Sequence, residues 1–224
     1  MRTKYKLLDT DNIEKDKALI DELHRVADKY GATFESHYSL DYPFIIKQIF
    51  GQNLEIADFG CGIGALSFYL AEKGHKVWAF DRHDFSWFFT HPNIRFVQSN
   101  LLDHNSSGLR MGGRIVKKYD VVVAASAVEH NPNKQDIRTL VLEGLKVLKP
   151  GGKMILTTEC WKETKWAPLQ ESMCLGPKDI ERTFDHPIDF TEFDVMYGKF
   201  TNYPEWRHKC WEFLPYGVVI NNES

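Results

Sequence analysis

The sequence predicts an α/β fold in which helices cover both faces of an open, doubly wound and mostly parallel β-sheet, with helices added at the N-terminus. Five short apolar segments have the length and composition of buried strands. Helical segments alternate with these strands along the chain. The length of 224 residues fits one domain with additions better than two independent domains.

Two helices are expected before the first strand. The first begins near Asp11 and ends at Gly31, because apolar residues recur between them at spacings of three, four or seven. The second begins near Asp41, has Pro43 in its first turn and ends at Gly51. Both precede the sheet, so we expect them to form a helical cap.

The first strand–helix–strand unit covers residues 54–81. Residues 54–59 are an apolar strand, residues 65–73 a helix that Gly74 ends, and residues 75–81 a second strand. A right-handed crossover that brings the two strands together in parallel is the usual structure for such a unit.

The alternation continues with strands at residues 93–98, 119–125 and 153–158, and with a helix at 137–148 before the last of them. Ligands of such sheets bind beyond the carboxyl ends of the strands. The segments that follow the five strands are Gly60–Gly64, Asp81, Asn100, Ser126–His130 and Glu159. We therefore expect the functional residues among them.

Charge and cysteine content argue against several classes of protein. The chain has 28 Lys and Arg against 31 Asp and Glu, a net charge of −3, so nothing attracts it generally to nucleic acid or an anionic membrane. Cys61, Cys160, Cys174 and Cys210 form no C-x-x-C pair, which disfavours a zinc site or a disulfide framework. No signal peptide and no long apolar run is present, so we expect a cytoplasmic protein.

The strongest motif is Asp58–Gly64, which reads D-F-G-C-G-I-G and stands between a strand and a helix. Its glycines permit a tight turn and a close approach to a ligand, while the helix offers unpaired N–H groups. Asp81 ends the second strand, where a carboxylate can accept hydrogen bonds from two ribose hydroxyls. The motif predicts a ligand that contains a nucleoside.

The same glycines also satisfy the G-x-G-x-x-G/A pattern of dinucleotide-binding proteins, so NAD is an alternative ligand. The third glycine, Gly64, and the acid at Asp58 fit better around a ligand that has a cationic amino group and no pyrophosphate.

This part of the chain resembles the class I S-adenosylmethionine-dependent methyltransferases, in particular their small-molecule, "type 11"-like group. Members carry D-x-G-x-G-x-G, an acid after the second strand, an E-H segment and L-K-P-G-G in this order. The corresponding stretches are Asp58–Gly64, Asp81, Ala127–His130 and Leu148–Gly152. The resemblance implies a Rossmann-like sheet of seven strands, the last two from residues 190–197 and 211–220.

The resemblance also implies S-adenosylmethionine as cofactor and S-adenosylhomocysteine as product. Asp58 and the glycine loop would hold the methionine end, and Asp81 the ribose. The family usually has an Asp against the adenine where this chain has Asn100, so Asn100 is the first candidate and Asp103 the second. The full set of expected cofactor residues is Asp58, Gly60, Cys61, Gly62, Gly64, Asp81, Arg82, Asn100, Leu101 and Ser126.

Methyl transfer needs an acceptor atom in line with the donor carbon, and positioning supplies most of the catalysis. A hydroxyl acceptor also benefits from a general base. His130, just after the fourth strand, is the leading candidate, and Glu159 the second. The alternative role for His130 is to organise its loop. No histidine shows metal-ligand spacing, so a metal-independent reaction is expected.

The acceptor is expected outside the cofactor-binding half. Residues 160–175 contain Trp161, Trp166 and Met173 and have the length of a binding loop, before a helix that begins at Pro177. The region around Tyr38 and Tyr42 is a second possible cover. The aromatic residues favour a small-molecule acceptor, carbohydrate or aromatic, although they fit a satellite core equally well.

The sequence thus predicts a single methyltransferase domain over residues 1–224. It consists of a helical cap (1–51), a cofactor-binding half (52–158) and an acceptor loop with C-terminal strands (159–224). The rival interpretations are a protein or RNA methyltransferase, a nicotinamide-dependent oxidoreductase and a non-catalytic cofactor-binding subunit. An evident Tyr–Lys pair after the fourth strand, which would support the oxidoreductase, is lacking.

Overall fold

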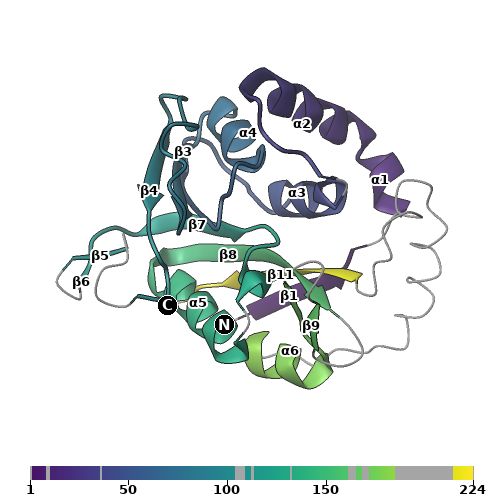
Figure 1. The fold of residues 1–224 in the computed structure, drawn as a ribbon, viewed down its shortest axis with the longest axis vertical. Coiled ribbons are helices and arrows are strands. Elements are labelled where there is room, and N and C mark those ends of the chain that lie inside the picture. Colours follow the sequence, from purple (N-terminus) through teal and green to yellow (C-terminus); the bar gives the residue numbers. More distant parts are fainter. Residues whose placement is uncertain are drawn as a thin grey trace.

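The computed structural model describes residues 2–8, 11–35, 37–103, 109–111, 114–131, 133–160, 165–167, 172–184 and 214–223. Its central strands are β1 (Arg2–Leu7), β2 (Glu55–Phe59), β3 (Lys76–Asp81), β4 (Ile94–Gln98), β7 (Tyr119–Ala124), β8 (Leu148–Cys160) and β11 (Leu214–Asn221). They form one seven-stranded sheet in the order β1-β11-β8-β7-β2-β3-β4 (Figure 1). The five strands from β8 to β4 pair in parallel, β11 pairs antiparallel with β8, and β1 pairs antiparallel with β11 and so runs in the direction of the five. The predicted fold class is confirmed.

Helices cover the two faces of the sheet. Their bounds are α1 (Asp11–Lys15), α2 (Lys17–Tyr30), α3 (Tyr38–Ile46), α4 (Leu66–Glu72), the 3-10 turn η1 (Val128–His130), α5 (Lys134–Lys146) and α6 (Pro177–Phe184). Helices α2, α3 and α4 lie on one face, and α5 and α6 on the other (Figure 1). Two short strand pairs are β5 (Arg110–Met111) with β6 (Arg114–Ile115), and β9 (Lys165–Ala167) with β10 (Ser172–Cys174).

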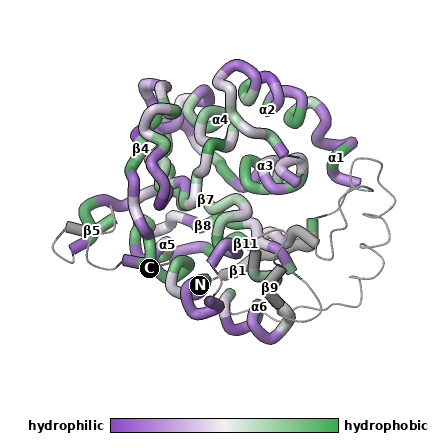
Figure 2. Tube along the Cα trace, viewed as in Figure 1, coloured by the Kyte–Doolittle hydropathy of each residue, from purple (hydrophilic) through white to green (hydrophobic). Residues whose placement is uncertain are grey.

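Alternation along the strands produces two apolar layers. In β7, Val121 and Val123 pack into the layer under α2–α4, while Val122 and Ala124 pack into the layer with α5 and α6. Helix α2 is amphipathic, with hydrophobic and hydrophilic residues alternating along its length (Figure 2). None of the helices within the described ranges is long and apolar enough to cross a membrane.

The edge strand beside β11 comes from the N-terminal segment and not from the C-terminal segment that was predicted to supply it. β11 confirms the strand expected at 211–220, but its second neighbour is β1, paired from Arg2↔Asn221 to Leu7↔Tyr216. Residues 190–197, expected to supply that strand, lie outside the described residues. The R-T-K-Y-K-L segment alternates basic with β-forming residues, which is typical of a charged edge strand. A purely helical N-terminal cap was therefore wrong.

The predicted cap helices differ in their bounds. The first is divided at Asp16 into α1 and α2, and Gly31 (φ +64°) ends α2 as expected. Asp16 is buried and forms an ion pair with Lys47. The second, α3, begins at Tyr38, three residues before the predicted start, so Asp41 lies buried inside it.

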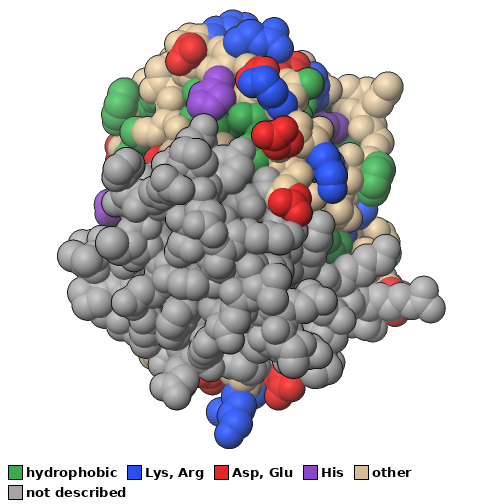
Figure 3. Space-filling model, turned by 90° about the vertical axis from the view of Figure 1, so that its right-hand side faces the viewer, with side chains coloured by type: hydrophobic (Ala, Val, Ile, Leu, Met, Phe, Trp, Pro, Cys, Tyr) green, Lys and Arg blue, Asp and Glu red, His purple; other side chains and the backbone are tan. Residues whose placement is uncertain are grey.

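The surface of α1 and α2 carries charges of both signs. Lys17 pairs with Asp21 on α2, and Lys29 and Lys73 form ion pairs between α2 and α4. Acidic and basic side chains are interspersed over the described upper part of the face that Figure 3 shows. This pattern is that of a solvated surface.

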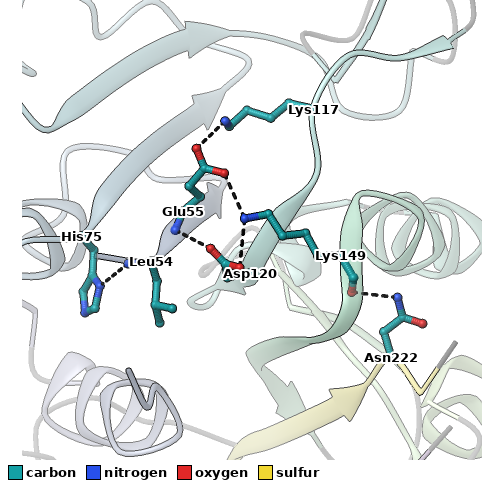
Figure 4. A network of polar contacts seen from close by, with 7 residues as sticks. All are labelled: Leu54, Glu55, His75, Lys117, Asp120, Lys149 and Asn222. Carbon is teal, nitrogen blue, oxygen red and sulfur yellow. Dashed lines mark hydrogen bonds and ion pairs between the residues drawn. The ribbon is translucent and has the colours of Figure 1, made fainter. Parts of the chain in front are cut away.

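A network of ion pairs joins the amino-terminal ends of the central strands (Figure 4). Lys149 Nζ lies 3.0 Å from Glu55 Oε2 and 3.0 Å from Asp120 Oδ1. Lys117 Nζ donates to Glu55 Oε1 at 2.6 Å, and the Glu55 N–H donates to Asp120 Oδ2 at 2.8 Å. The network therefore ties β2, β7 and the start of β8 together, at the end of the sheet away from the predicted site.

We expect Asp120→Ala to lower the free energy of unfolding by about 1–3 kcal/mol, because it leaves the Glu55 N–H without its acceptor and Lys149 with one of its two carboxylate partners. For a chain of this size the midpoint of thermal unfolding would fall by roughly 3–10 °C. Asp28→Ala on the exposed side of α2 is the control and should change the midpoint by no more than about 1–2 °C. Equal midpoints for both variants would contradict the importance of the network.

Candidate active site

A cavity of about 260 Å³ lies where β2, β3, β4 and β7 end, on the carboxyl edge of the parallel strands. This is the edge at which open α/β sheets bind ligands. The residues that line it are Tyr38, Tyr42, Asp58, Phe59, Gly60, Cys61, Gly62, Leu66, Asp81, Arg82, His83, Ser99, Asn100, Leu101, Leu102, Ala125, Ser126, Ala127, His130, Asn131 and Leu140.

The structure brings nearly all predicted site residues to this cavity. Every expected cofactor residue lines it except Gly64, which packs beneath the hydroxyl of Tyr42. His130 also lines it, whereas Glu159 and Asp103 are not among the lining residues. Glu159 is half-buried on β8, where Cys174 Sγ lies 3.7 Å from its Oε2. The first candidates for the adenine contact and the general base, Asn100 and His130, therefore line the cavity, whereas the second candidates, Asp103 and Glu159, do not.

The glycine loop has a conformation that few other residues adopt. Gly60 has a φ of +68°, and a Cβ atom there would lie 2.6 Å from the Cβ of Ala127. The N–H groups of Gly60 and Cys61 both donate to the carbonyl of Phe80, at 2.8 and 3.1 Å. Because Ala127 follows β7 and Phe80 belongs to β3, the loop is fixed by both neighbouring strands.

Asp81 is oriented by the backbone around it. Its Oδ2 accepts a hydrogen bond from the Gly62 N–H at 3.0 Å, and its Oδ1 accepts one from the His83 N–H at 2.9 Å. A carboxylate has about four acceptor positions, so both oxygens keep capacity for a ligand. The geometry suits a diol that lies beside the glycine loop.

Asp58 lies almost fully buried at the end of β2, with 3% of its surface exposed. Burial raises its pKa from 3.8 to about 7, a hydrogen bond from Ser67 partly offsets this rise, and the charge of Asp81 adds to it. Ser67 Oγ donates to Asp58 Oδ2 at 2.6 Å. A cationic group bound nearby would therefore favour the ionised form of Asp58.

The segment after β4 contributes Ser99, Asn100, Leu101 and Leu102 to the cavity. The side-chain oxygen of Asn100 accepts a hydrogen bond from the Leu102 N–H at 3.1 Å, which forms an Asx turn. That oxygen has a second lone pair for a ligand. Leu101 is buried and offers an apolar surface next to it.

The segment after β7 carries the remaining polar residues. Ser126 has a φ of +45°, an uncommon value for a residue other than glycine. Its N–H donates to Thr157 Oγ1 at 3.0 Å and its hydroxyl donates to Asp41 Oδ2 at 2.5 Å. η1 follows and places the exposed side chain of His130 at the cavity.

The N-terminal cap closes the cavity on the side of α3. The rings of Tyr38 and Tyr42 stack with centroids 4.4 Å apart, and both line the cavity. Burial raises the pKa of both phenols above their ordinary value, so both keep their protons at neutral pH. The Thr33 N–H donates to the Ile63 carbonyl at 2.9 Å and joins the cap to the glycine loop. The predicted cover by Tyr38 and Tyr42 thus lies at the site.

Several contributors were not predicted from the sequence, among them Ser99, Leu140 and Asp41. Ser99 and Leu140 line the cavity, although Leu140 was expected only as part of a helical stripe. Asp41 was read as a helix start and is instead buried against Ser126. A charged residue within an apolar helical run was the available signal, because buried charges are costly unless they have a role.

Glu129 gives the fold a pH dependence. It is fully buried, and burial raises its pKa from 4.5 to about 8, with the Asp41 carboxyl adding to the rise. The native protein therefore keeps a proton that the unfolded chain loses above a pH of about 4.5. Since the native state then binds more protons, this group makes the free energy of unfolding fall as pH rises from about 5 to about 8.

We expect Glu129→Gln to flatten this pH dependence. At pH 8.5 its midpoint of thermal unfolding should exceed that of the wild type by about 3–8 °C, whereas at pH 5 the two should agree within about 2 °C. Glu181→Gln, on the exposed side of α6, is the control and should follow the wild type at both pH values. Parallel curves for Glu129→Gln and the wild type would contradict the buried, protonated state.

Comparison with known proteins agrees with this geometry. A family model described as a methyltransferase domain matches residues 56–152. A ubiquinone biosynthesis O-methyltransferase of Rickettsia akari is 33% identical over 107 residues, which are 47% of this chain and 40% of that relative. The chain thus spans less than half the length of that curated relative.

Solved structures share the fold at low identity. A 1,6-didemethyltoxoflavin-N1-methyltransferase of Burkholderia thailandensis has a TM-score of 0.58 at 13% identity, over 93% of this chain and 87% of that one. A coclaurine N-methyltransferase has a TM-score of 0.54 at 15% identity, over 92% of this chain and 73% of that one.

The sheet and its cavity define an α/β protein with a site for a nucleoside-containing ligand at the carboxyl edge. The methyltransferase model covers the glycine loop, Asp81, η1 and α5. Residues 56–152, which carry these features, are therefore similar to the methyltransferase domain family.

Proposed function

We propose that this chain transfers the methyl group of S-adenosylmethionine to a small-molecule acceptor by in-line displacement. One observation carries the proposal: residues from four separate segments, each following a different parallel strand, line a single cavity at the carboxyl edge of the sheet. The family motifs select these residues from positions 58 to 130, and parallel pairing brings the strand ends that carry them to one edge of the sheet.

Asp58 and the glycine loop would hold the methionine end of the donor. The N–H groups at the start of α4 offer donors to its carboxylate. Asp58 provides a negative charge for a cationic group, and its raised pKa would fall when that group binds. Cys61 lies in the same loop and contributes cavity wall.

The nucleoside end would lie between the segments after β3 and β4. Asp81 would accept hydrogen bonds from the two ribose hydroxyls, with its orientation set by Gly62 and His83. Asn100 would accept a hydrogen bond from the adenine amino group, and Leu101 would contact the ring. Arg82 lies at the exposed rim, and Ser126 lines the opposite wall.

The bound donor would supply a methyl group on a positively charged sulfur, which is already a good leaving group. The protein then has to exclude water and align the acceptor atom about 3 Å from the methyl carbon. His130 is placed at the cavity with an exposed ring and is our candidate for the general base of a hydroxyl acceptor. Glu159 is a weaker candidate because its carboxylate, on β8, lies beside the thiol of Cys174 on β10 and does not line the cavity.

A small-molecule acceptor is favoured by the curated relative, whose name refers to ubiquinone biosynthesis. The structural neighbour with bound 1,6-didemethyltoxoflavin also acts on a small molecule. Of the loop residues expected to hold the acceptor, Met173 is buried, and the side chains of Trp161 and Trp166 lie outside the described residues.

The test uses S-adenosylmethionine labelled in its methyl group. The protein is incubated with metabolites extracted from its source cells and, separately, with protein and RNA from the same cells. We expect label in the low-molecular-weight fraction only. Label in protein or RNA alone would assign a macromolecular acceptor, and donor binding without any transfer would indicate a non-catalytic subunit. A His130→Ala variant that keeps full turnover would exclude His130 as the base.

A further inference from the structure

We propose that Asp41 is a positioning residue, which holds Ser126 and through it the segment at residues 125–131 in the conformation that forms the cofactor cavity. The inference rests on the proposed function, because it assigns a role in donor binding to a residue outside the cavity. It is carried by the contact between Asp41 and Ser126, which are 85 residues apart in the sequence.

Burial makes an acid costly at Asp41. It lies in the first turn of α3 with none of its surface exposed, and its neighbours Leu40, Tyr42 and Ile45 are apolar or aromatic core residues. Burial raises its pKa to about 7, although hydrogen bonds from Ser126 and Thr157 partly offset the rise. An apolar residue would fill this position without that cost, so the carboxyl group indicates a specific task.

Ser126 is the residue that needs to be held. Its φ of +45° places the backbone in the left-handed region, which a serine adopts only when its surroundings impose it. Two side chains hold Ser126 in this conformation from different layers. Thr157 of β8 accepts a hydrogen bond from the Ser126 N–H, and Asp41 of α3 accepts one from the Ser126 hydroxyl. Removal of the Asp41 carboxyl would take away the contact that holds this turn from α3.

The conformation of Ser126 decides where the next residues lie. Ala127 follows directly and packs against Gly60, with so little space that a methyl group on Gly60 would lie 2.6 Å from the Cβ of Ala127. His130 and Asn131 follow on η1 and line the cavity. A displacement of Ser126 would therefore move both the wall beside the glycine loop and the candidate base.

Other ionisable groups face the same position. Glu129 of η1 and Tyr38 of α3 both interact electrostatically with Asp41, as does Tyr42. None of these groups brings a positive charge. The contact between Asp41 and Ser126 therefore depends on the hydrogen bond itself, which asparagine can also accept.

The experiment compares S-adenosylhomocysteine binding to the full chain and its variants by calorimetry, well below all unfolding midpoints. We expect Asp41→Ala to weaken binding at least fivefold. Asp41→Asn, which keeps an acceptor oxygen of the same reach, should stay within twofold of the wild type. Ser126→Ala should also weaken binding, and the double variant should lose less than the sum of the two single losses, because both changes remove the contact between Asp41 and Ser126.

Ser39→Ala is the matched control, since Ser39 is a buried polar residue of the same helix and does not line the cavity. It should leave binding unchanged. Asp41→Ala with wild-type affinity, or additive losses in the double variant, would overturn the inference while the proposed function stands. A wild-type protein that does not bind S-adenosylhomocysteine would overturn both.

Discussion

Asp81→Ala is expected to lower the affinity for S-adenosylhomocysteine by about 30- to 100-fold, which corresponds to two lost hydrogen bonds to a charged group at about 1–1.5 kcal/mol each. Asp81 also holds the N–H groups of Gly62 and His83, so its removal loosens the loop that forms the rest of the site. Binding is measured by calorimetry at pH 7.5, with the unfolding midpoint as a check on folding.

Asp84→Ala is the control for this prediction. Asp84 is exposed, stands three residues after Asp81 and accepts a comparable hydrogen bond from the Ser86 N–H at 2.9 Å, but it does not line the cavity. Its replacement should leave the affinity within about twofold. If Asp81→Ala also stays within this range, the assignment of Asp81 to the ribose is wrong.

Gly60→Ala is expected to abolish measurable binding, with a loss of more than about 100-fold, and to lower the unfolding midpoint by roughly 5–10 °C. Two effects combine at this position. The φ of +68° is strained for any residue with a Cβ, and the new methyl group would collide with Ala127.

Gly151→Ala separates these two effects. Gly151 has a similar φ of +75°, but a Cβ there meets nothing within 4 Å, and it lies on β8 at the opposite end of the sheet. We expect this variant to lose about 1–2 kcal/mol of stability and no affinity. A Gly60→Ala protein that binds as tightly as Gly151→Ala would show that the glycine loop does not contact the ligand.

The cofactor half could be predicted because its signals are local. The glycine loop and Asp81 stand at fixed positions after two apolar strands, and parallel pairing then brings the ends of those strands together. Asn100 and His130 follow their strands in the same way. Strand ends thus locate site residues without knowledge of tertiary contacts.

The contacts of the N-terminal segment could not be predicted in this way. Asp41 reaches Ser126 across 85 positions, and no local pattern specifies such a pair. β1 carries a two-residue alternation, but its partner β11 lies at the other end of the chain. Local patterns indicate a helix that begins near Asp41, but they do not specify the distant residue that Asp41 contacts.

The most direct test of the central claim is a calorimetric titration of the wild-type protein with S-adenosylhomocysteine, with NAD titrated in parallel. We predict saturable binding of S-adenosylhomocysteine at one site per chain, with a dissociation constant below about 100 µM, and no heat of binding for NAD. Binding of NAD alone, or of neither ligand, would contradict the assignment of the cavity to a methyl donor.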